Sequence, residues 1–349
     1  MNKEENIKVG ITIGDPNGIG GEIILKAFED PRMLEMFTPV VFASTKLLSF
    51  YAKKFDIKAK IHGITSLKDA VPGKFNVMRL FKEPFIVNWG EVSTEAGELA
   101  IQSLQAATAA LKENHIDVLV TAPINKESIH SDSFKFPGHT DYLNQELEGE
   151  SLMFMVSGDL RVGLLTDHVA VKDVPSKINA KVIKTKIGTI KESLKKDFGI
   201  TKPRIAVLGI NPHVGDNGVI GTDDQDTLIP ALEELREDGN IIFGPYAADS
   251  FFGNKKYKEF DAVLASYHDQ GLVPFKTIAF GQGVNYTAGL SHVRTSPDHG
   301  TGFDIAGKGE ANPESFVAAI HTAIDIFRKR KEYDILNENP LKKLSRKRR

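Results

Sequence analysis

Short apolar runs alternate along the chain with amphipathic stretches in which apolar side chains recur every three or four residues. Runs of the first kind predict strands, at residues 7–13, 39–43, 116–120, 152–156, 160–165, 205–210 and 262–265. Stretches of the second kind predict helices, at residues 21–28, 94–114, 176–196, 223–237 and 313–329. Strands that alternate with helices in this way indicate an α/β protein with a largely parallel sheet.

Composition narrows the class of protein. Of the 349 residues, 41% are hydrophobic and 26% are charged, and the formal net charge is −2, so no overall field draws the chain to nucleic acid or to an anionic membrane. No uncharged apolar run is long enough to cross a bilayer, and the first residues do not resemble a signal peptide. We expect a globular cytoplasmic protein. Residues 342–349 carry six basic side chains and predict a solvated tail, with nucleic-acid binding as the less favoured alternative.

Three histidines share one sequence context. His168, His213 and His268 each follow an apolar run that predicts a strand, and in open α/β sheets ligands bind at that edge. The chain has no cysteine, so disulfides, thiolate metal sites and a cysteine nucleophile are excluded. Three histidines with an open fourth position are typical of a catalytic divalent-metal site, which the pattern predicts, with Asp167 and Asp269 to orient two rings. Three unrelated loop histidines are the alternative.

Several side chains are suited to an anion. A turn that leads into a helix places His139 and Thr140 near the helix start, where backbone N–H groups favour negative charge. Farther along, the cations Lys276 and Arg294 and the neutral amide of Asn285 lie in a stretch with few other cations. Arginine offers a planar fork for carboxylate or phosphate, and lysine a point charge. The alternatives are a helix cap at Thr140 and ordinary surface charges at the two cations.

Residues 296–313 are dense in glycine and polar side chains. Glycine lets a backbone close on a ligand, so this segment predicts a ligand-binding loop in which Asp304 accepts hydrogen bonds from a ribose or an adenine. The glycines at positions 14–21 do not match the G-x-G-x-x-G spacing of a Rossmann dinucleotide site, so the sequence does not predict that fold.

Motifs spread along the chain carry a family resemblance. Over nearly its whole length the chain resembles the 4-hydroxythreonine-4-phosphate dehydrogenase family of the pyridoxal phosphate pathway. The motifs are, in order, Gly14-Asp15-Pro16-Asn17-Gly18-Ile19-Gly20, Thr121-Ala122-Pro123-Ile124-Asn125-Lys126, Gly138-His139-Thr140, Thr166-Asp167-His168, Asn211-Pro212-His213, Tyr267-His268-Asp269-Gln270-Gly271 and residues 304–313. Taken together, they are highly specific.

The resemblance implies roles for the site residues. His168, His213 and His268 would bind a divalent metal, zinc first, with cobalt or magnesium as alternatives. The substrate would be contacted by His139, Thr140, Lys276, Asn285 and Arg294. NAD or NADP would bind at residues 304–308, which look like the cofactor loop of isocitrate and isopropylmalate dehydrogenases, with contacts from Gly300, Asp304, Gly307 and Asn312.

The resemblance also implies the architecture. We expect the two-domain, non-Rossmann α/β fold of isocitrate and isopropylmalate dehydrogenases, with the active site in the interdomain cleft. Residues 1–122 and 281–349 would form the larger domain with the cofactor loop. Residues 123–280 would form the middle domain, with the metal ligands and the dimer interface. The chain would work as a homodimer whose subunits share the active sites.

The implied activity is NAD(P)-dependent oxidation and decarboxylation of 4-phosphohydroxy-L-threonine to 3-amino-2-oxopropyl phosphate and CO2. A sister branch, which acts on D-erythronate or D-threonate 4-phosphate, shares the motifs. The general base stays open among His139, Lys126 and Asp249, in that order of preference. Two other classes remain. A three-histidine zinc hydrolase or hydratase leaves the glycine-rich segment unexplained, and a non-catalytic phosphate-binding protein leaves the three histidines unexplained.

Overall fold

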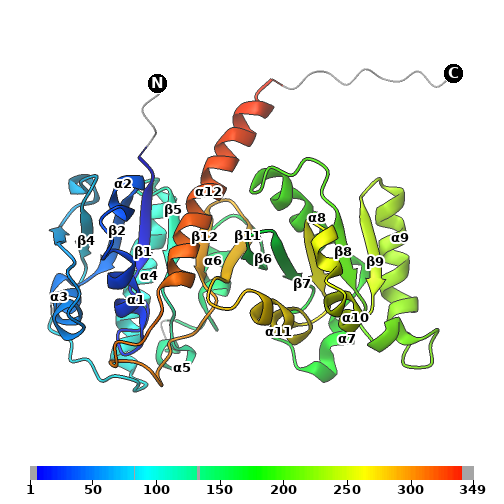
Figure 1. Cartoon of the computed structure of the whole chain (residues 1–349), viewed down its shortest axis with the longest axis horizontal. Coiled ribbons are helices and arrows are strands. Elements are labelled where there is room, and N and C mark those ends of the chain that lie inside the picture. Colours follow the sequence, from blue (N-terminus) through cyan, green and yellow to red (C-terminus); the bar gives the residue numbers. More distant parts are fainter. Residues whose placement is uncertain (1–5, 82, 132–133, 340–349) are drawn as a thin grey trace.

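One twelve-stranded sheet runs through the computed structural model, which describes residues 6–339 except 82, 132 and 133 (Figure 1). The strands are β1 Lys8–Thr12, β2 Thr38–Ala43, β3 Ile61–Ile64, β4 Phe75–Arg79, β5 Val118–Thr121, β6 Gly149–Ser157, β7 Leu160–Leu164, β8 Ile205–Leu208, β9 Ile242–Tyr246, β10 Ala262–Ala265, β11 Val284–Leu290 and β12 Val293–Pro297. Their order is β3-β4-β2-β1-β5-β12-β11-β6-β7-β10-β8-β9. Neighbours are parallel except at β12–β11, β11–β6 and β6–β7, which confirms the predicted α/β class with a largely parallel sheet. The basic tail at 342–349 lies outside the described residues.

Helices flank both halves of this sheet (Figure 1). They are α1 Gly20–Ala27, α2 Met33–Met36, α3 Thr45–Lys54, α4 Thr94–Lys112, α5 Lys126–Ile129, α6 His139–Glu146, α7 Val174–Lys177, α8 Ala180–Lys196, α9 Ile229–Glu237, α10 Ala248–Gly253, α11 His268–Ile278 and α12 Glu314–Asn337. Short 3₁₀ turns occupy Leu67–Asp69, Val171–Asp173, Pro212–Gly215 and Lys256–Glu259, and a π-helical turn at Asp224–Leu228 leads into α9. In the described part of the chain, no helix is both long and apolar enough to cross a membrane.

The long, strongly patterned elements lie where the sequence predicts them, with two differences in the helices. The helix predicted at 176–196 is divided, because the Asn179 side chain accepts a hydrogen bond from Val182 N (3.0 Å) and starts α8 anew. The last helix continues beyond residue 329 to Asn337. The pattern missed β3, β4, β9, β11, β12, α2, α3, α5, α10 and α11.

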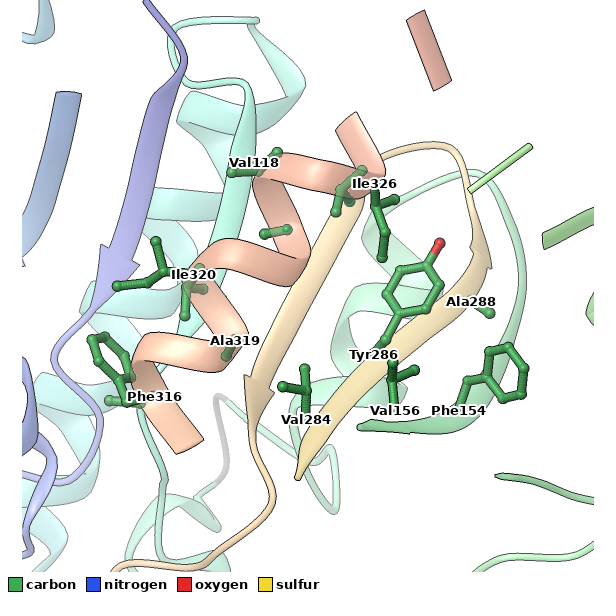
Figure 2. Close-up of a cluster of buried hydrophobic side chains, with 14 of the residues drawn as sticks. Val118, Phe154, Val156, Val284, Tyr286, Ala288, Phe316, Ala319, Ile320 and Ile326 are labelled. Carbon is green, nitrogen blue, oxygen red and sulfur yellow. The ribbon is translucent and has the colours of Figure 1, made fainter. Parts of the chain in front are cut away.

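Helix α12 covers one face of the sheet at its centre (Figure 2). Its apolar side chains, among them Phe316, Ala319 and Ile320, belong to the same buried cluster as Val284 and Tyr286 of β11. Near the end of the helix, buried Arg330 donates from Nε to Asp197 Oδ1 (2.7 Å), which ties α12 to the end of α8. The opposite face of β12 and β11 is thereby left free to form a cavity.

Candidate active site

A cavity of about 260 Å³ lies against the middle of the sheet, where strand direction reverses between β12 and β11. Asn285 of β11 is paired with Ser296 of β12, and both line the cavity together with Arg294. Side chains alternate between the faces of a strand, so Thr295 points the other way and donates its hydroxyl to Ala319 O of α12 (2.8 Å). Residues that follow the carboxyl ends of β5, β7 and β10 also line the cavity, among them Pro123, His168 and His268, and ligands of open α/β sheets usually bind at that edge.

Arg294 is the main charged group of this cavity. Only 1% of the residue is exposed, and its guanidinium donates to Thr121 Oγ1 (3.1 and 2.6 Å) and to Thr287 Oγ1 (3.0 Å). No carboxylate among the described residues forms an ion pair with it. Burial lowers the pKa of Arg294 to about 9, which still leaves it charged at neutral pH. A buried charge without a counterion is costly, so an anionic ligand is favoured here, and the interpretation of Arg294 as a surface charge is wrong.

The start of α6 forms one wall. The predicted turn leading into a helix is present, with Gly138 at the cap position, and His139 and Thr140 both line the cavity. No side chain caps this helix, so Thr140 does not serve as a cap. His139 Nε2 is buried and has no hydrogen-bond partner in the described structure. Burial, and then the charge of Arg294, lower the pKa of His139 well below its usual value, so the ring is a neutral acceptor at physiological pH.

Helix α11 and the loop after β7 bring two of the three predicted metal-binding histidines together. The rings of His168 and His268 both line the cavity, with their centroids 6.2 Å apart. His268 Nδ1 lies 2.7 Å from Asp269 Oδ1, a contact that orients the ring. One turn from the end of α11, exposed Lys276 also lines the cavity, and its ammonium donates to Asp298 O (2.9 Å).

The remaining predicted residues divide in two. Lys126, the first residue of α5, lines the cavity, whereas His213 and exposed Asp249 do not. In the described part of one chain, no three histidine or carboxylate side chains form a group that could hold a metal ion. One chain therefore brings two of the three histidines to this cavity and leaves His213 apart from them.

A second cavity, of about 350 Å³, adjoins the first and shares Lys276, Asp298, His299 and Gly300 with it. Its other lining residues are Ile19, Phe280, Gly281, Gly302, Ile305, Asn312 and Ser315. Of the predicted cofactor contacts, Gly300 and Asn312 line this second cavity. Asp304, which is exposed, and Gly307, which is partly buried, do not. The sequence interpretation missed His299, although it stands beside Gly300 in the glycine-rich segment, and its Nε2 is buried without a partner in the described structure.

Comparisons with known proteins agree on one family. The family model described as pyridoxal phosphate biosynthetic protein PdxA matches residues 35–323. A 4-hydroxythreonine-4-phosphate dehydrogenase of Bacteroides thetaiotaomicron is 46% identical over 343 residues, which cover 98% of this chain and 94% of that protein. The D-threonate 4-phosphate dehydrogenase of Cupriavidus necator is 37% identical, covering 92% and 98%. The crystal structure of the Klebsiella pneumoniae 4-hydroxythreonine-4-phosphate dehydrogenase superposes with a TM-score of 0.80 at 34% identity, covering 94% and 99%.

Proposed function

The chain belongs to the PdxA family of pyridoxal phosphate biosynthetic proteins, and from this we propose that it oxidises and decarboxylates 4-phosphohydroxy-L-threonine with NAD or NADP, giving 3-amino-2-oxopropyl phosphate and CO2. The observation that carries the substrate class is Arg294, a buried cation without a carboxylate partner among the described residues, in a cavity that also holds Lys276 and Asn285. A second candidate is oxidation of D-threonate or D-erythronate 4-phosphate, because the Cupriavidus relative is a D-threonate 4-phosphate dehydrogenase.

Formation of NADH or NADPH, followed by absorbance with each phosphorylated acid, tests the proposal. We expect the highest kcat/KM with 4-phosphohydroxy-L-threonine and one molecule of CO2 released per reduced cofactor. A preference for D-threonate or D-erythronate 4-phosphate would assign the chain to the sister activity. Turnover of a substrate without any reduced cofactor would favour a zinc hydrolase or hydratase instead.

The lining residues have separable tasks in this reaction. The nicotinamide supplies the acceptor for the hydride, and the protein orients the two reactants. Arg294 and Lys276, with Asn285, hold the charged end of the substrate. His139, a neutral acceptor beside Arg294, is our first choice for taking the hydroxyl proton, ahead of Lys126, which also lines the cavity, and Asp249, which in one chain does not.

We also propose a divalent metal, zinc first, on His168, His213 and His268. The facing pair His168 and His268 fits two positions of such a site. Bound there, the metal would supply a Lewis acid for the substrate hydroxyl and the ketone that replaces it. Because one chain does not bring His213 to the pair, we place the site in a homodimer with shared active sites.

The assembly leads to a measurable expectation. Sedimentation of the active protein should give the mass of two chains, because a single chain does not gather the metal ligands. Mixing the His213→Ala variant with the impaired Arg294→Ala variant should give more activity than either variant alone if subunits exchange and sites are shared. A fully active monomer would contradict this proposal.

The cofactor loop gives another prediction. Gly307 has a φ of +77°, and a Cβ there would lie 2.6 Å from Trp89 Cγ, so Gly307→Leu would displace the loop. We expect the KM for NAD(P) to rise about tenfold or more, with a smaller change in the KM for the substrate. Asp304→Ala should act in the same direction. The control is Gly239→Ala, also at a positive φ (+82°) but with open space around its Cβ. Equal changes in both KM values would argue against a cofactor loop.

His139, whose Nε2 is buried, predicts a pH dependence. If neutral His139 accepts the proton, kcat/KM should persist as pH falls through 6.5, the usual histidine value, and decline only below it, because burial and Arg294 oppose protonation. In His139→Gln this acid limb should be lost or displaced, together with most of kcat. If the acid limb of the pH profile is unchanged in that variant, the general base is Lys126 or Asp249 instead.

The finer architecture also stays a proposal. We propose two domains, one formed by residues 1–122 and 281–349 and the other by residues 123–280. This division cuts the sheet at a single place, between β11 and β6. The main cavity draws lining residues from both parts, which supports an active site between two domains of the isocitrate and isopropylmalate dehydrogenase kind. A cytoplasmic location belongs to the same proposal, as does independence from nucleic acid.

A further inference from the structure

The segment from His299 to Pro313 contains no helix or strand, so its shape depends on contacts with the rest of the chain. The first part of the segment is hydrogen-bonded to the loop before α1, and its last part is hydrogen-bonded to α1 itself. Ile19 N donates to Thr301 O (3.0 Å), and Lys26 Nζ donates to Gly309 O (2.9 Å). These ties come from the glycine-rich start of the chain, whose spacing does not match a dinucleotide fingerprint.

An ion pair on α1 binds the end of this loop. The side chain of Glu22 is fully buried, and its Oε1 accepts from Lys26 Nζ (2.8 Å) and from Ala311 N (2.9 Å). Lys26 Nζ also donates to Ala311 O (2.7 Å). The pair therefore holds both polar backbone groups of Ala311. Because the carboxylate is buried, loss of Lys26 alone would leave a charge without its counterion.

Asn17 supports the middle of the loop through a turn at residues 88–91. The buried Asn17 side chain accepts from Asn88 N (2.9 Å) and donates to Glu91 O (2.9 Å), so it holds both ends of this turn. The turn lies directly against the loop. A Cβ on Gly90 would come within 2.6 Å of Phe303 O, and Trp89 is the neighbour that a Cβ on Gly307 would meet.

We propose that Asn17, Glu22 and Lys26 are positioning residues that hold the loop of residues 299–313 in its cofactor-binding shape and so set the affinity for NAD(P). None of the three lines either cavity, so they act through the turn at 88–91 and through Ala311 rather than by touching a ligand. This inference rests on the cofactor site proposed above. It gives a role to a motif that the reaction itself does not use.

The test compares Asn17→Asp and the double variant Glu22→Gln/Lys26→Met with matched controls. Asn76→Asp changes another buried amide that binds backbone carbonyls, those of Pro39, Val71 and Lys74, away from the loop. Lys329→Met removes an exposed lysine that pairs with Glu332 on α12. For each protein, the Kd for NADH is measured by fluorescence, KM values for both reactants by kinetics, and loop exposure by hydrogen exchange.

We expect about a tenfold rise in the Kd for NADH and in the KM for NAD(P), because Asn17→Asp removes a buried amide hydrogen bond and the double variant removes charge-assisted ones. The substrate KM and the kcat at saturating cofactor should stay within about twofold of the wild type. Exchange at 299–313 should quicken, and the emission of Trp89, the single tryptophan of the chain, should shift. The control variants should show none of these changes.

Two kinds of failure are distinguishable. If the wild type binds NADH normally and the variants match it in Kd and in loop exchange, the positioning role is overturned while the proposed function stands. Equal losses in the control variants would also overturn it, by showing general destabilisation. If the wild type neither binds nor reduces NAD(P), the proposed function fails and the link to cofactor affinity fails with it, whatever the loop exchange shows.

Discussion

Alanine in place of His268 is expected to remove most of the bound divalent metal and to lower kcat/KM by about a hundredfold or more, because a metal-stabilised charge is worth several kcal/mol. The fold should persist, since the side chain is partly exposed and its removal opens no cavity in the core. His168→Ala should behave in the same way, because the two rings face each other at 6.2 Å. Elemental analysis of the purified proteins, beside kinetics, measures both effects.

A matched control exists in His115. Its Nδ1 lies 3.2 Å from Glu113 Oε2, with side chains 43% and 66% exposed, and the His268–Asp269 pair is 40% and 75% exposed. His115→Ala should keep full metal content and activity. His213→Ala then decides whether the third ligand is correct. Unchanged metal in all three variants would show the assignment to be wrong, and a loss confined to His168 and His268 would reduce the set to two.

The position of His213 shows where prediction from the sequence reached its limit. His168 and His268 come four and three residues after β7 and β10, which are parallel neighbours, so both reach the same edge of the sheet. His213 comes five residues after β8. There the carboxylate of Asp224 accepts from Ile210 N (2.7 Å) and Asn211 N (2.9 Å), and the chain turns into the left-handed region at His213 itself (φ +53°). No local sequence pattern predicts that the chain turns away from the other two histidines at this point.

The centre of the sheet was missed for a related reason. The predicted strands are continuous apolar runs, such as Ala262–Ala265, whereas β11 and β12 carry Thr287 and Arg294. These polar side chains are buried and bind each other (3.0 Å), and Arg294 also binds Thr121, 173 residues away in sequence. The amino-acid sequence alone does not show that hydroxyl groups on distant strands accept hydrogen bonds from a buried arginine. For the same reason, the sequence predicts Arg294 as an anion-binding residue but does not exclude a surface charge.

Arg294→Ala is expected to lower kcat/KM for the phosphorylated substrate by about ten- to a hundredfold, the range for one charge-assisted contact of about 1.5–3 kcal/mol. Arg294→Lys keeps the charge but loses the planar fork, so its defect should be intermediate. The wild type should use the dephosphorylated substrate poorly. Arg294→Ala should discriminate less between the two forms, and steady-state kinetics with both substrates measures this.

Stability separates this arginine from a structural one. Removal of Arg294, which has no carboxylate partner in the described structure, should cost far less stability than breaking an ion pair. Arg330 is the matched control, because it is buried and paired with Asp197 at 2.7 Å. Arg330→Met should lower the free energy of unfolding by about 3–5 kcal/mol while keeping the preference for the phosphorylated substrate. If Arg294→Ala keeps that preference as strongly as the wild type, Arg294 does not bind the phosphate. We would then infer that the charge of Arg294 binds the carboxylate of the substrate.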